Sequence, residues 1–182
     1  KLKLVPGATP QATEANLIIE KAAGPDTPVK MKYIVFRNST GFVQEYDQGT
    51  GTISGHALNP NAITVAATRW DDLQKVEAFS SRGAQNSGEL GFSKPDLTAP
   101  NGGNVTVISP AFKDYSGDAD ASPNFFGTSA AAPHAAAVAA LLLDARNSLN
   151  AAVPDLKAAL LNGTTPLGPA FEAGSGFLEA DR

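Results

Sequence analysis

Apolar and polar positions divide the second part of the chain into short segments and one long helix. The apolar run of residues 62–68 predicts a strand, and a valine-rich stretch at 104–108 predicts another. Residues 128–149 hold an alanine- and leucine-rich run with few polar side chains, which predicts a helix packed closely inside a domain. A second helix is predicted over 153–161, between a proline and an Asn-Gly pair. The serine- and glycine-rich residues 79–91 are predicted to form a loop.

The first part of the chain has a different pattern. Residues 15–21 and 29–37 alternate apolar and polar side chains, and the turn-forming residues 23–26 separate them. A third short strand is predicted at 42–46. Residues 1–51 therefore predict a β-rich lobe ahead of the mixed segment at 52–182.

Ser129 follows Gly127 and Thr128 at the predicted start of the long helix. The first N–H groups of a helix have no partner within it, and the positive end of its dipole stabilises negative charge. These conditions suit a nucleophilic serine whose own backbone N–H helps to hold an oxyanion. The alternative is structural, because serine also caps helices for ordinary backbone reasons.

The octapeptide Gly127-Thr128-Ser129-Ala130-Ala131-Ala132-Pro133-His134 resembles the serine motif of subtilisin-like serine proteases, Gly-Thr-Ser-x-Ala-x-Pro-His. Further segments resemble the same family in the same order, at residues 62–68, 79–83, 94–100 and 174–180. The resemblance implies an α/β fold, an incomplete subtilisin-like parallel-sheet layer with helices, carrying the β-rich lobe at its amino-terminal side. It also implies a peptide or protein substrate and Ser129 as the nucleophile.

Two residues depart from the family pattern. Ala137 stands where the family usually has a glycine in the helix, and Asn101 replaces the glycine of an expected Ala-Pro-Gly. We expect Ala137 to shift a helix contact without touching the chemistry. Asn101 is expected to alter a loop near the active face.

The partners that serine catalysis needs are not evident in this sequence. A base must take the hydroxyl proton and a carboxylate must orient that base. His134 is five residues beyond Ser129, so we expect its ring to point away from Ser129 and into the domain interior. His56, the other of the two histidines, has no catalytic pattern beside it, and a local structural role is expected.

The family's Asp block, its His-Gly-Thr block and its oxyanion asparagine are thus expected upstream of Lys1. This resemblance implies that residues 52–182 are the C-terminal portion of a catalytic domain and that residues 1–51 end an insertion. The isolated chain is expected to be inactive, and the upstream part of its own catalytic domain is an expected partner. A non-catalytic subtilase-like binding or scaffold module is the alternative.

Composition narrows the classes of partner. The formal charge is −4 and no basic run is present, which argues against nucleic acid. We expect no membrane-spanning run or targeting signal, because Pro133 and His134 interrupt the longest apolar stretch. The absence of cysteine excludes disulfides and thiolate metal sites. By its resemblance to bacterial subtilases, the parent protein is expected to be secreted or extracellular.

An acidic loop suggests a cation, although no cofactor is otherwise expected. Asp114, Asp118 and Asp120 offer the carboxylate oxygens that Ca²⁺ prefers. Their spacing does not match an EF-hand, so a solvated acidic loop is the alternative to a calcium site.

Overall fold

The computed structural model describes residues 22–25, 49–85, 92–106, 112–115, 117–149 and 155–180. The chain divides into a unit of Lys1–Arg37 and a unit of Asn38–Arg182, and every helix and strand described lies in the second unit. Within the first unit only an exposed bend at 22–25 is described. The strands predicted at 15–21, 29–37 and 42–46 lie outside the described residues, so the β-rich lobe stays a prediction.

Two parallel strands form the centre of the sheet. β1 (Val65–Arg69) and β3 (Leu97–Asn101) pair in register from Val65 opposite Leu97 to Arg69 opposite Asn101. The middle residues of β1 are buried, as expected for a parallel strand covered on both faces. The strand predicted over 62–68 is therefore confirmed, although it begins later, at Val65, and ends at Arg69.

Shorter strands extend the sheet on both sides, in the order β2-β1-β3-β7-β6. β2 (Asp72–Val76) runs antiparallel to β1, and β7 (Phe177–Leu178) runs parallel to β3. β6 (Thr164–Thr165) pairs antiparallel with β7. A separate small hairpin joins β4 (Lys113–Asp114) to β5 (Pro123–Asn124) directly before the long helix.

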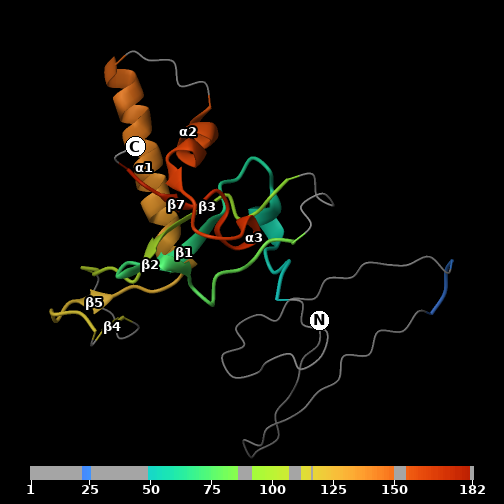
Figure 1. The fold of residues 1–182 in the computed structure, drawn as a ribbon, viewed down its shortest axis with the longest axis horizontal. Helices are drawn as coiled ribbons and strands as arrows, with labels where there is room; N and C mark the ends of the chain where they lie inside the picture. The colour runs from blue at the N-terminus through green and yellow to red at the C-terminus, as the bar shows by residue number, and fades with distance from the viewer. Residues whose placement is uncertain are drawn as a thin grey trace, which may run out of the picture. The chain divides into compact units, whose positions relative to one another are not determined.

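The long helix and a shorter one pack together on this sheet. α1 (Thr128–Leu149) has the predicted bounds and packs against β1 and β3, and α2 (Leu156–Asn162) packs beside it (Figure 1). Asp155 caps α2 by accepting hydrogen bonds from the N–H groups of Lys157 and Ala158. The extended backbone of Asp155 means that α2 begins later than the predicted start at residue 153.

Two further turns of helix complete the described fold. The 3₁₀ helix η1 (Gly55–Leu58) precedes β1, and α3 (Ala170–Ala173) precedes β7. The Thr64 hydroxyl donates to Ala57 O, which ties η1 to the amino end of β1. The Thr98 hydroxyl donates to Ala173 O, which ties α3 to β3.

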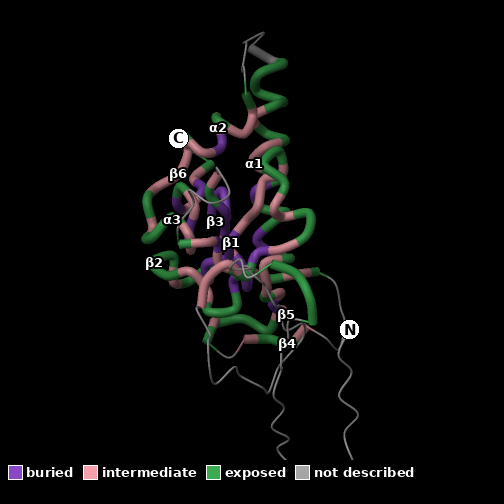
Figure 2. Tube along the Cα trace, turned by 90° about the vertical axis from the view of Figure 1, so that its right-hand side faces the viewer, coloured by how far each residue is buried: buried purple, intermediate pink, exposed green. Residues whose placement is uncertain are grey.

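The core lies between α1 and the sheet. Buried residues gather in β1, β3 and the first half of α1, as Figure 2 shows. Its members are small or branched apolar residues: Ala67, Leu97, Ala99, Ala131, Ala135, Leu160 and Leu178. Alanine on α1 lets the helix backbone approach the strands closely, so the alanine-rich sequence has a packing reason.

Only one stripe of α1 is covered by the described residues. Leu141 is 63% exposed and Leu143 is 40% exposed, and Ala132, Pro133 and Ala136 are exposed too. The expectation of a helix packed closely inside a domain is therefore confirmed only for the stripe of α1 that faces β1 and β3. Thr128–Asn147 is also long and apolar enough to span a membrane, although no membrane-spanning run was expected. The core helix of a soluble protein meets the same test of length and composition.

Two strands differ from the sequence prediction. β2 lies in the segment between the first strand and the predicted loop, where no strand was expected, and it is an exposed strand. The second central strand is 97–101 instead of 104–108, where Asn104 forms only an isolated bridge and residues 107–111 are outside the description. Gly102 adopts a positive φ of 82° and ends β3, so the strand precedes the valine-rich stretch.

Candidate active site

The start of α1 meets the carboxyl ends of β1 and β3. Asn101, the last residue of β3, is fully buried and its Oδ1 accepts a hydrogen bond from Gly127 N at 3.1 Å. Its Nδ2 donates to Thr68 O on β1 at 2.6 Å. Asn101 is thus a buried strand residue that joins β1 to the turn before Ser129, and its expected effect on a loop near the active face stays a prediction.

Ser129 lies in the first turn of α1 and is exposed. Gly127 before it has a φ of 133°, and its carbonyl accepts from the N–H groups of Ala130 and Ala131. Among the described residues, neither the hydroxyl nor the N–H of Ser129 forms a hydrogen bond. A hydroxyl and an adjacent N–H are therefore both available to a ligand at the positive end of a helix.

The two histidines are not part of this arrangement. His134 is exposed, and its Nδ1 lies 2.8 Å from Ala130 O within α1, so the expectation that its ring enters the domain interior is wrong. His56 is exposed on η1, which is bonded to the amino end of β1, whereas Ser129 lies at the carboxyl end. A strand of five residues spans about 13 Å between those ends, so His56 is not within hydrogen-bond distance of Ser129.

Comparison with known proteins identifies the family of the chain. The sequence model of the subtilase family, peptidase S8, matches residues 6–176. The chain belongs to the subtilase family. No curated protein matches it.

Two solved structures similar to this subtilase chain are described as the "self-cleaved protease domain of PatA" and the "Patellamide maturation protease PatA". Their sequence identities are 21% and 22%, and their TM-scores are 0.49 and 0.46. The matches cover 73% and 69% of this chain but only 44% and 42% of the other chains. The chain thus spans less than half the length of these proteins. The predicted α/β subtilase class is confirmed by the family match and by the mixed sheet with its packed helices.

The hairpin before Ser129 brings the predicted acidic residues of this subtilase together. One carboxylate oxygen from each of Asp114, Asp118 and Asp120 lies within 4.8 Å of the others. Asp120 already accepts from Ser122 N and from Asn104 Nδ2, both at 2.7 Å, and these bonds lower the pKa of its carboxyl. Both the calcium site and the solvated loop stay predictions, which a Ca²⁺ titration followed by thermal melting distinguishes.

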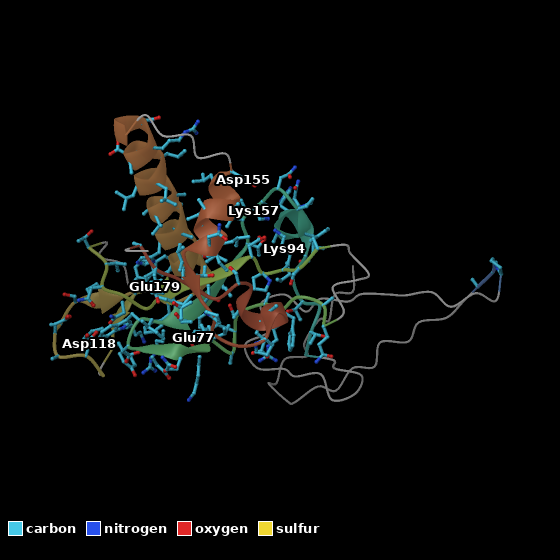
Figure 3. The ribbon with its side chains drawn as sticks, turned by 45° about the horizontal axis from the view of Figure 1, so that its top comes forward. Glu77, Lys94, Asp118, Asp155, Lys157 and Glu179 are labelled. Atoms are coloured by element: carbon cyan, nitrogen blue, oxygen red, sulfur yellow. The ribbon has the colours of Figure 1, made fainter. Side chains whose placement is uncertain are left out.

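A buried ionic cluster at the opposite end of the sheet was not predicted. The Lys94 Nζ lies 2.5 Å from Asp96 Oδ2, and the Lys157 Nζ lies 2.6 Å from Asp96 Oδ1. Lys94 is 3% exposed and Asp96 is 8% exposed. Thr64 N also donates to Asp96 Oδ2, so Asp96 links β1, β3 and α2. Figure 3 labels Lys94 and Lys157, the two lysines that contact Asp96. The sequence shows Lys94 and Asp96 two positions apart, but only the fold shows that Lys157 completes the cluster.

Proposed function

We propose that Ser129 is the nucleophile of a subtilisin-like serine endopeptidase. Its Oγ attacks the carbonyl carbon of a peptide bond, and its backbone N–H donates to the oxyanion that forms. The observation that supports this proposal is the pairing of an exposed hydroxyl with an unbonded N–H at the start of α1. Ser129 also lies at the carboxyl ends of the parallel strands β1 and β3, where α/β folds commonly bind ligands.

The proton-transfer partners are proposed to come from outside these 182 residues. Neither histidine of the sequence lies beside Ser129, and an unactivated serine hydroxyl is a weak nucleophile at neutral pH. The base, the carboxylate that orients it and a second oxyanion donor therefore belong to another part of the parent protein. The chain on its own is proposed to be inactive, and the parent is proposed to be secreted by resemblance to bacterial subtilases.

Peptide hydrolysis by matched proteins tests this proposal. The 182-residue chain and its Ser129→Ala variant should hydrolyse a mixed peptide library at the same background rate. In the parent protein, Ser129→Ala should lower the rate by several orders of magnitude while unfolding free energy falls by about 1 kcal/mol or less. Ser129-dependent turnover by the chain alone would overturn the proposed need for external partners.

The alternative is a non-catalytic subtilase-like module used for binding or as a scaffold. The same Ser129→Ala comparison in the parent decides between the two functions. Equal peptide hydrolysis by the parent and its variant would favour the scaffold, because a scaffold needs the helix and not the hydroxyl.

A further inference from the structure

The turn that carries Ser129 depends on a glycine. Gly127 has a φ of 133°, a conformation that other residues rarely adopt and that glycine shares with many others of similar energy. Its carbonyl accepts from the N–H groups of Ala130 and Ala131, so the conformation of Gly127 sets the start of α1. Ser129 lies in that first turn. The direction of the Ser129 side chain and N–H therefore depends on contacts that hold Gly127 from outside the helix.

Asn101 supplies such a contact. Its Oδ1 accepts from Gly127 N at 3.1 Å, so Gly127 is held by β3 through its N–H and by α1 through its carbonyl. Gly102 N also donates to Phe125 O at 2.9 Å, but only backbone atoms form that bond. Among the described residues, Asn101 is thus the side chain whose replacement releases Gly127 and leaves the backbone sequence of the turn unaltered.

The Asn101 amide is held in one orientation. Its Nδ2 donates to Thr68 O at 2.6 Å and lies 3.4 Å from Oε1 of Glu77, which Figure 3 labels. A reversed amide would direct Oδ1 at these two acceptors and the NH₂ group at the N–H of Gly127. The side chain is fully buried, and the backbone carbonyl of Asn101 accepts from Trp70 N at 2.9 Å. Oδ1 is therefore a fixed acceptor that ties the turn to β1 and β3.

We propose that Asn101 is a positioning residue for the nucleophile. Its Oδ1 holds Gly127, and Gly127 keeps Oγ and N–H of Ser129 in the directions that attack and oxyanion binding require. This role rests on the proposed function, because it concerns how Ser129 performs that reaction. A shift of about 1 Å in a reacting group costs up to about a hundredfold in rate. The glycine of the family pattern at this position has no side chain, so the contact is a feature of this chain.

Peptide hydrolysis by variants of the parent protein tests the positioning role. Asn101→Ala should lower kcat per folded molecule by at least about tenfold and change KM by less than about twofold, since the loss falls on the transition state. Asn101→Asp keeps the acceptor for Gly127 but loses the donor to Thr68, so its kcat should stay within about threefold of the original. The matched control is Thr98→Val, because Thr98 is fully buried on the same strand and its hydroxyl donates to Ala173 O. It should lose stability and keep its kcat per folded molecule.

A merely structural role of Asn101 predicts different kinetics. Asn101→Ala and Thr98→Val would then both lose stability and keep kcat per folded molecule, which would overturn the positioning role. An equal fall in kcat for Asn101→Asp and Asn101→Ala would overturn it too, because the acceptor for Gly127 is still present in the former. Hydrolysis that does not depend on Ser129 in the unaltered parent contradicts the proposed function itself, and the positioning role with it.

Hydrogen exchange of the same parent proteins tests the contact without a reaction. Mass spectrometry of the peptide that contains Gly127 should show exchange at least about tenfold faster in Asn101→Ala than in the original, and Asn101→Asp should keep the protection. Thr98 N, which donates to Gly176 O within the sheet, reports on the fold as a whole. Equal acceleration at Gly127 and Thr98 would contradict a local hold on the turn. Asn101→Ser replaces Asn101→Ala if circular dichroism shows that the latter is unfolded.

Discussion

Replacing Asn101 should destabilise the protein through two named backbone groups. Asn101→Ala leaves the N–H of Gly127 and the carbonyl of Thr68 without their side-chain partner. An unsatisfied buried group costs about 1–3 kcal/mol. Thr68 is fully buried and carries the full cost, whereas Gly127 is only partly buried and water offsets some of its cost. We expect the free energy of unfolding to fall by about 2–4 kcal/mol.

Urea unfolding of three variants measures this effect. Asn61→Ala is the matched control, because Asn61 is exposed, and its effect should stay within about 0.5 kcal/mol. Asn101→Asp keeps the size of the side chain and the acceptor for Gly127 but loses the donor to Thr68. Burial raises the pKa of the new carboxyl in the folded state, so this variant should lose stability as the pH rises. An Asn101→Asp variant as stable as the original at neutral pH would refute the hydrogen-bonding role and leave only packing.

The remaining predictions concern exposed and ionic side chains. Leu141→Lys on the exposed side of α1 should change the unfolding free energy by less than about 0.5 kcal/mol, and a larger loss in urea would mean that this side is covered. Asp96→Asn should lower the free energy of unfolding by about 3–5 kcal/mol, because the charges of Lys94 and Lys157 lose their buried partner. The control is Asp144→Asn, because Asp144 is exposed. Equal losses of stability in the two variants would contradict the role of the ionic cluster. The pKa of the Asp120 carboxyl is lowered in the folded protein. The ionised carboxylate therefore stabilises the loop at any pH above the ordinary carboxyl pKa, and this stabilisation is lost as the pH falls through the lowered pKa of the folded state. Hydrogen exchange at Ser122 N should therefore accelerate in acid, and Asp120→Asn should remove that pH step.

Local sequence signals were sufficient for the elements with strong periodicity. The apolar run after Ser129 predicted α1 with both of its bounds, and the apolar segment at 62–68 predicted β1. These segments are long or uniform enough for the hydrophobic pattern to decide the structure. The glycine turn and the unpaired N–H groups of a helix start were also sufficient to predict where Ser129 would lie.

Long-range partners decided the features that the sequence missed. Pro100 argues against a strand by propensity, yet it pairs in β3 because parallel neighbours and burial outweigh that preference. The role of Asn101 depends on Thr68, which is 33 positions earlier, and the ionic cluster depends on Lys157. No local pattern contains such a pairing. The exposure of His134 likewise follows from which face of α1 meets the sheet.

Covalent labelling of the parent protein tests the central claim most directly. A fluorophosphonate reacts with an activated serine hydroxyl and adds a fixed mass to the peptide that carries it. The nucleophile assignment predicts that this mass is found on Ser129 and that peptide hydrolysis falls in proportion to the labelled fraction. Hydrolysis that continues with Ser129 fully labelled, or a label on a different serine that abolishes hydrolysis, would contradict it.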